Sequence, residues 1–267
     1  MTPIEIVRRK VDFDFSAAPV ARWSDMPLEY ESALNVLSHF FPAGEAFFIT
    51  SVRAYFDEIR DPALKAAAEH FIFQEGMHSR AHARCNHALD AVSPAGERVS
   101  KGVATLLAVV RKLTPCSVQL AVTCALEHFT AMFADALLRN QDTVFVNFDP
   151  AFARLWLWHA AEETEHKGVC FDVYRHCVGD SLLAYLVRTG AMVCATVILL
   201  IALAVALSQI RVRASAPAGR SRLGMMLGWL PLRAYLDYYG RSFHPWSHDN
   251  RALVAQWRAK NPDASFA

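Results

Sequence analysis

The sequence predicts an all-α protein, a four-helix bundle with an additional hydrophobic C-terminal helical segment. Three observations support this prediction. Apolar residues recur at helical spacing over long stretches, and polar residues are embedded in those apolar stripes. Helix-start signals, in which a capping residue precedes a proline at the first helical position, stand at Asp61-Pro62, Thr114-Pro115 and Asp149-Pro150.

The chain divides into four parts by composition. Residues 1–28 mix proline, aspartate and aromatic residues without a sustained period, so we expect an extended arm that packs on the domain through Phe13, Phe15 and Trp23. We expect little chemistry in this arm. The bundle itself is predicted over 29–180, the hydrophobic helical segment over 181–240, and a polar tail over 241–267.

The helices of the bundle are placed by proline signals and by Gly179-Asp180. We expect a first helix after Pro42, a second from Pro62 to Ser93, a shorter one over about 100–112, a third long helix from Pro115, a loop over QDTVFVNFD, and a fourth helix from Pro150 to Gly179.

Charge and cysteine content exclude several classes of function. Lys and Arg total 27 against 26 Asp and Glu, so no strong positive field attracts nucleic acid. The six cysteines form no CxxC pair, and the charged N-terminus lacks the apolar region of a signal peptide. We therefore expect a cytoplasmic protein with no nucleic-acid partner.

Two Glu-x-x-His motifs carry the strongest chemical signal. Glu75-Gly-Met-His78 and Glu163-Thr-Glu-His166 each lie in the middle of a long predicted helix. A separation of three residues puts both side chains on one helix face. Both motifs interrupt stripes of Phe, Trp, Cys and Val, where an unpaired carboxylate is costly to bury. Each motif therefore indicates a cation.

Two single glutamates, Glu45 and Glu127, interrupt apolar stripes in the same way. With them, each of the four helices contributes ligands, and four carboxylates nearly neutralise two divalent ions. Mixed oxygen and imidazole ligation favours iron, manganese or a mixed Mn/Fe pair over zinc. His82 and His159 face the core near these residues and are either structural histidines, hydrogen-bond partners of the ligands, or additional ligands.

The alternative for each motif is a hydrogen-bonded polar network without a metal. Glu162 and Glu165 fall on other faces of the fourth helix, and His128 is displaced from the stripe of the third. We expect surface or network positions for these three residues.

The order of ligands along the chain resembles that of the ferritin-like di-iron carboxylate superfamily. More narrowly, FPAGEAFF, FQEGMHSRAH and EETEHK resemble a bacterial family of predicted metal-dependent hydrolases, over about 30–240. The superfamily resemblance implies that Glu45 and Glu127 are single terminal or bridging ligands. It also implies that Glu75 pairs with His78, and Glu163 with His166.

Three functions are compatible with such a site. Two iron ions could oxidise an apolar or lipid-like substrate with O₂, with an electron-donating reductase as partner. The same metals could activate water for hydrolysis. The protein could instead bind iron or dock on a membrane without catalysis. Glu-rich ligation from helix interiors favours oxidation among the three.

The hydrophobic segment bears on the substrate and on localisation. Residues 189–207 carry no charge and are long enough to span a membrane, and a second apolar stretch, 223–239, is interrupted by Pro231, Arg233 and Asp237. Arginines on both sides of 189–207 favour a shallow hairpin over a single span, so that 189–239 would attach the protein to the inner face of the cytoplasmic membrane. The alternative is a fifth helix that covers the bundle or forms a homodimer interface.

Overall fold

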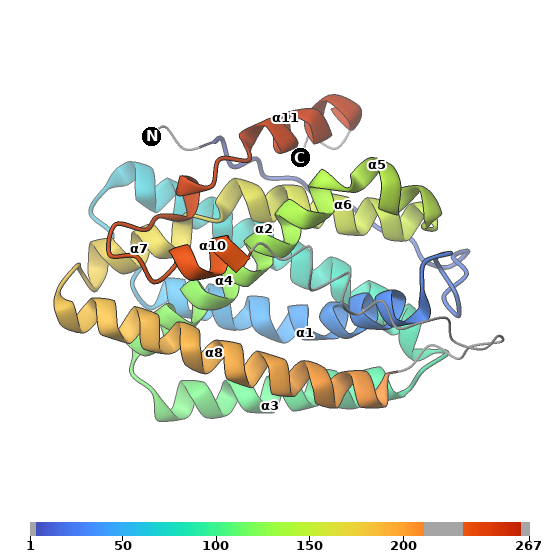
Figure 1. The fold of residues 1–267 in the computed structure, drawn as a ribbon, viewed down its shortest axis with the longest axis horizontal. Helices are drawn as coiled ribbons and strands as arrows, with labels where there is room; N and C mark the ends of the chain where they lie inside the picture. The colour runs from blue at the N-terminus through green and yellow to red at the C-terminus, as the bar shows by residue number, and fades with distance from the viewer. Residues whose placement is uncertain (1–3, 211–231, 263–267) are drawn as a thin grey trace.

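The computed structural model describes residues 4–210 and 232–262, which form an all-α fold (Figure 1). The helices are α1 (Leu28–Arg53), α2 (Pro62–Asp90), α3 (Ala95–Leu113), α4 (Cys116–Arg139), α5 (Gln141–Val144), α6 (Pro150–His166), α7 (Val169–Cys177), α8 (Leu182–Gln209), α10 (Leu232–Asp237) and α11 (Arg251–Lys260), with short 3₁₀ turns at Phe145–Asn147 and Pro245–Ser247. These ranges contain no strand, and a single β-bridge joins Ser24 to Phe148. The predicted all-α class is confirmed.

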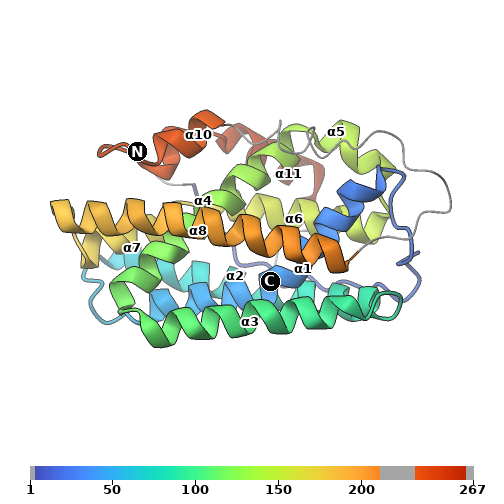
Figure 2. The same cartoon turned by 60° about the horizontal axis from the view of Figure 1, so that its bottom comes forward.

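Four helices surround the core that holds the predicted site. α1 packs against α2 and α4, and α6 packs against α2 and α4, while α7 continues the contacts of α6. α3 and α8 run along one side of this group (Figure 2). Phe71 and Leu120 are fully buried at one end of the core, and Leu34 and Phe152 at the other. The polar site lies between two apolar clusters.

The first helix begins earlier than expected, because α1 contains Pro42 in its interior. Proline has no N–H to donate to the carbonyl four residues before it. Here that carbonyl belongs to Ser38, and it accepts a hydrogen bond of 2.9 Å from the Asn86 side-chain amide of α2. A side chain from the neighbouring helix thus replaces the missing helical bond, and α1 continues through the proline.

The expected fourth helix is interrupted directly after His166. Lys167 and Gly168 separate α6 from α7. The Lys167 ammonium is buried and donates to the His248 carbonyl and the Asn250 side chain, at 2.6 and 2.7 Å. A Cβ on Gly168 would lie 2.9 Å from Nε1 of Trp246, closer than Cβ contacts normally come. The C-terminal segment therefore fixes the break, which sequence periodicity alone could not indicate.

The described residues of the N-terminal arm and of α11 pack together beside α6. As predicted, Phe13, Phe15 and Trp23 of the arm are buried. The Trp23 ring stacks on Phe152 with centroids 4.4 Å apart. In the tail, Trp257 of α11 is also buried, beside the arm (Figure 1). The expected loop over 141–149 is instead mostly the short helix α5 and a 3₁₀ turn.

Among the described residues, the two helices α4 and α8 are long and apolar enough to cross a membrane by length and composition. Their packing differs. In the most apolar window of α4, 67% of the residues are buried in the protein, against 22% in α8. α4 is thus a core helix, whereas α8 presents a large apolar surface. Most of the second apolar stretch, 223–231, lies outside the described residues.

Candidate metal centre

The structure brings all six predicted ligands together in the core. Glu45 comes from α1, Glu75 and His78 from α2, Glu127 from α4, and Glu163 and His166 from α6. None of the six is more than 3% exposed. Four carboxylates and two imidazoles thus share one interior region. Each of the two single glutamates and each of the two Glu-x-x-His motifs comes from a different helix.

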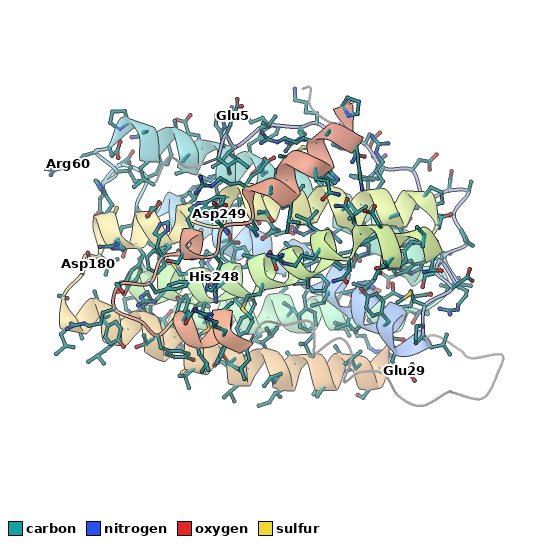
Figure 3. All side chains as sticks on the ribbon, turned by 45° about the horizontal axis from the view of Figure 1, so that its top comes forward. Glu5, Glu29, Arg60, Asp180, His248 and Asp249 are labelled. Carbon is teal, nitrogen blue, oxygen red and sulfur yellow. The ribbon has the colours of Figure 1, made fainter. Side chains whose placement is uncertain are left out.

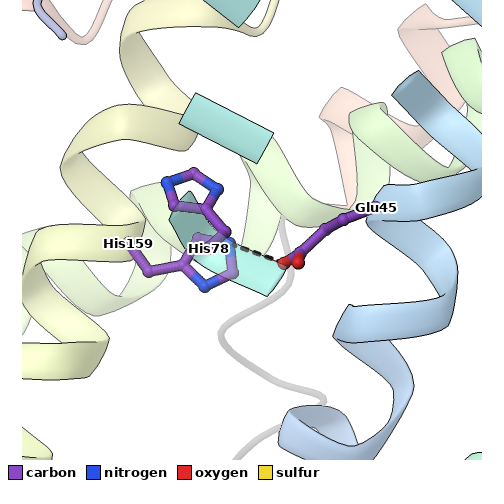
Figure 4. Close-up of side chains that lie close together, drawn as sticks. All are labelled: Glu45, His78 and His159. Atoms are coloured by element: carbon purple, nitrogen blue, oxygen red, sulfur yellow. Dashed lines mark ion pairs between the residues drawn. The ribbon is translucent and has the colours of Figure 1, made fainter. Parts of the chain in front are cut away.

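One group of possible ligands consists of Glu45, His78 and His159 (Figure 4). One donor atom from each residue lies within 4.8 Å of the others. The Glu45 carboxylate points toward the two rings, and Nε2 of His159 lies 3.8 Å from its Oε1. His159, one of the two histidines with open roles, therefore offers a donor atom at the site itself.

A second group consists of Glu75, Glu127, Glu163 and His166, again with donor atoms within 4.8 Å. Nε2 of His166 lies 3.1 Å from Glu75 and 3.6 Å from each of the other two carboxylates. Glu163 and His166 fall in one group, as the resemblance implies, whereas Glu75 and His78 fall in different groups.

The two groups meet at Glu75 and Glu163. Nδ1 of His78, in the first group, lies 3.7 Å from Oε1 of Glu75 and 3.5 Å from Oε1 of Glu163. Both carboxylates therefore reach imidazoles of both groups.

Many of the polar atoms of the six predicted ligands lack hydrogen bonds. Within the described part of the chain, each predicted ligand has at least one buried oxygen or nitrogen without a hydrogen-bond partner. The six ligands contribute both oxygens of Glu45, Glu75 and Glu127, Oε2 of Glu163, Nδ1 of His78 and Nε2 of His166. Buried polar groups are normally paired, and an isolated buried charge is very costly. A divalent cation would satisfy these atoms, so the residues present fit a metal centre.

Ionisation at the site is strongly perturbed. Burial, together with the charge of Glu75, raises the pKa of Glu45 well above its ordinary value, and burial with the charge of Glu163 does the same for the pKa of Glu127. Burial opposes the charged form of His78 and His166, but the surrounding carboxylates raise the pKa of both rings well above normal. Burial also opposes ionisation of Glu75 and Glu163, but the charge and hydrogen bonds of the histidines lower the pKa of both carboxyls. Without a cation, Glu45 and Glu127 are therefore the carboxyls that retain protons.

His82 and His159 form a hydrogen-bonded chain behind the site. Nε2 of His82 lies 2.7 Å from Nδ1 of His159, whose Nε2 lies 2.9 Å from Glu163. On its other side, His82 contacts the Ser38 hydroxyl at 2.9 Å. Burial lowers the pKa of His159 to about 4 and that of His82 well below normal, so both rings are neutral. His82 thus orients His159, which in turn contacts a predicted ligand.

Gln74 orients His166, a role that no motif in the sequence indicates. Its amide nitrogen donates to the Val7 carbonyl and to Glu165, both at 2.9 Å, so the amide oxygen faces the His166 ring. That oxygen accepts from Nδ1–H of His166 at 2.9 Å. The acceptor fixes the proton on Nδ1 and leaves Nε2 for an ion, as is typical of histidine ligands.

Glu162 performs the same task for His78. Its carboxylate accepts from Nε2–H of His78 at 3.0 Å and pairs with the Arg9 guanidinium at 2.9 Å. Arg9 also forms a two-point ion pair with Glu165, at 2.6 and 2.9 Å. Glu162, Glu165 and Arg9 are all buried. Glu162 and Glu165 were expected at surface or network positions, and both lie in a buried network. Arg9 of the N-terminal arm supplies positive charge that balances the two carboxylates.

His128 is also buried, but it lies outside the candidate metal centre. Its Nε2–H donates to the Ala234 carbonyl. It lines a hollow of about 490 Å³ between α4 and the C-terminal segment that carries His248 and Asp249. Figure 3 labels both of these residues. This hollow contains none of the predicted ligands.

Replacing Gln74 with leucine tests the orienting network. The leucine keeps the volume but removes the acceptor of His166 Nδ1–H, and loss of such a partner typically weakens metal binding by about 10–100-fold. We expect that loss in an Mn²⁺ titration followed by electron paramagnetic resonance. Glu69→Gln, on the exposed face of the same helix, is the control and should bind like wild type. Equal affinity of all three proteins would contradict the assignment.

Metal binding should also displace protons. Because the pKa values of Glu45, Glu127, His78 and His166 are raised, the metal-free site holds protons near neutral pH that a divalent ion must displace. Apparent affinity should therefore rise with pH between about 6 and 8, by up to about tenfold per unit for each proton released. Calorimetry in two buffers of different ionisation enthalpy measures the release. A binding heat that does not depend on the buffer would count against this prediction.

Comparison with known proteins agrees with a metal-dependent function. A family model described as "predicted metal-dependent hydrolase" matches residues 7–249, nearly the whole described chain. Searches of curated proteins and of solved structures found no match. The family match extends beyond the 30–240 region of resemblance and includes Arg9 and the six predicted ligands. The chain therefore belongs to the family of predicted metal-dependent hydrolases.

Proposed function

We propose that this protein is a hydrolase that depends on two divalent metal ions, held by Glu45, Glu75, His78, Glu127, Glu163 and His166. The observation that carries the proposal is the set of buried donor atoms without partners, which come from four helices and converge on one region. The family description supports hydrolysis over the oxidation that Glu-rich ligation favours from sequence alone.

The residues of the chain divide the work between holding the ions and orienting the ligands. Glu75 and Glu163, which lie near imidazoles of both groups, would each hold an ion, as would Glu45 in the first group and Glu127 in the second. His159 either completes the first group or positions Glu163 through its hydrogen bond. Iron and manganese suit this mixture of carboxylate and imidazole ligands.

The chemistry needed for hydrolysis fits this arrangement. A bound divalent ion lowers the pKa of a water molecule and polarises a carbonyl group. The protein surrounds the site with Phe71, whose ring edge lies against His166 (centroids 4.9 Å apart), and Trp158, whose ring lies against His78 at the same distance. These aromatic walls exclude bulk water and leave the polar atoms of the site facing one another.

A second candidate is oxidation by O₂, with iron as the metal and a reductase as electron donor. One observation favours it: all ligands are buried residues of helices, and the four carboxylates supply more negative charge than zinc-type hydrolytic sites usually contain. The two candidate functions can be separated because oxidation requires O₂, whereas hydrolysis does not.

Turnover of a carboxylic ester without oxygen tests the proposed function. Protein loaded with Mn²⁺ or Zn²⁺ should hydrolyse 4-nitrophenyl butyrate in an anaerobic chamber, and a chelator should abolish the activity. Glu127→Gln removes one ligand charge, and activity should fall by more than about 100-fold, since loss of mere hydrogen-bond partners of ligands costs 10–100-fold.

The matched control is Glu97→Gln, which alters an exposed glutamate paired with Lys101 on α3 and should leave turnover unchanged. Ester hydrolysis that persists in chelator would contradict the proposal. Absence of anaerobic turnover, combined with O₂ consumption by the Fe²⁺-loaded protein, would replace it with the second candidate.

A further inference from the structure

An apolar cavity of about 180 Å³ lies between α1, α3, α4 and α8. Its walls, formed by described residues, expose no polar surface. An engineered apolar cavity of about 150 Å³ stays dry and binds benzene, so a space of this size can hold part of an apolar ligand. Ile198 of α8 lines the cavity and is 41% exposed, so the cavity lies next to the exposed face of this helix.

The inner end of this cavity adjoins the metal centre. Phe41, Thr130 and Phe133 line it, and the same three residues line a much smaller cavity whose opposite wall includes His159 and Glu163. The Phe41 ring lies 4.6 Å from the His159 ring, centroid to centroid. Phe41, Thr130 and Phe133 therefore separate the apolar cavity from the metal centre.

The outer end lies where the protein exposes its most apolar surface. α3 is packed loosely, with only Gly96 and Val99 fully buried, and α8 exposes Val197, Leu200 and Ile201 to more than half of their area. The most apolar window of α8 has a mean hydropathy of 2.7, in the range of membrane-embedded helices. A surface of this kind is suited to contact with lipid.

We propose that the apolar cavity binds the aliphatic chain of an ester lipid taken from a membrane, which enters between α3 and α8 and places its carbonyl group at the metal centre beyond Phe41. This inference rests on the proposed function and names its substrate class. In the reaction, the oxygen of water bonds to the carbonyl carbon, the ester C–O bond breaks, and the leaving alkoxide takes up a proton that this water has released, giving a fatty acid and an alcohol.

Two measurements test the inference separately. The first is binding of cis-parinaric acid, a fluorescent fatty acid, to metal-free protein, which reports on the cavity alone. The second is hydrolysis of 4-nitrophenyl esters from acetate to dodecanoate by metal-loaded protein. Each buried methylene should raise kcat/KM by about fourfold until the cavity is filled.

Variants that fill the cavity have matched controls on the same helices. Leu106→Trp on α3 introduces a large ring into the cavity, whereas Val109→Trp places the same ring at a position that is 47% exposed and outside the lining. On α8, Ala202→Phe and Ala204→Phe form an equivalent pair, which serves if Leu106→Trp does not fold. The cavity-filling variants should bind parinaric acid about tenfold more weakly. They should also lose the preference for long esters, and the controls should behave like wild type.

The outcomes separate the two proposals. If wild-type protein binds parinaric acid and Leu106→Trp does not, but no ester is hydrolysed, the cavity assignment stands and the hydrolase proposal fails. If wild-type protein does not bind parinaric acid, or if filled and control variants bind it equally, the inference is overturned even where short esters are hydrolysed. If wild-type protein extracts ester lipid from phosphatidylcholine vesicles and Leu106→Trp does not, the membrane is the source of the substrate. If the protein hydrolyses only esters that are free in solution, a membrane source is contradicted.

Discussion

The burial of four carboxylates in one helical core is the constraint on which the rest of the structure depends. Glu45, Glu75, Glu127 and Glu163 cannot all be ionised in a nonpolar interior without positive charge, and burial raises the pKa of two of them. The nearby imidazoles offset part of this charge. A pair of divalent ions would offset the remainder, which explains why so many donor atoms have no hydrogen-bond partner in the described chain.

The surrounding network extends this constraint to both ends of the chain. His166 is held by Gln74 and His78 by Glu162, and the buried Arg9 of the arm balances Glu162 and Glu165. Arg258 of α11 adds a second cation on Glu165, at 2.8 Å. The arm and tail, which look peripheral in sequence, thus stabilise the orientation of the two histidines at the centre.

Helix class, most helix starts and the convergence of the six candidate ligands could be predicted because they depend on local signals: capping residues, prolines and polar residues in apolar stripes. Other features depend on distant partners. α1 continues through Pro42 because Asn86 satisfies the Ser38 carbonyl, and α6 ends at His166 because Lys167 bonds to the C-terminal segment. The same holds for Arg9 and Gln74, whose roles follow only from contacts across more than 60 positions of sequence. The ferritin-like relationship and the ligand roles themselves stay predictions.

The most direct test of the central claim is the number of ions that the core holds. Metal-free protein dialysed against Fe²⁺ or Mn²⁺ without oxygen, and then analysed for metal and protein, should retain about two ions per chain, as the two groups of donors require. Glu163→Ala, which removes the carboxylate that reaches both groups, should retain fewer. Retention of no ion by the wild-type chain would contradict the account and would leave the carboxyls and imidazoles as a buried polar network without metal.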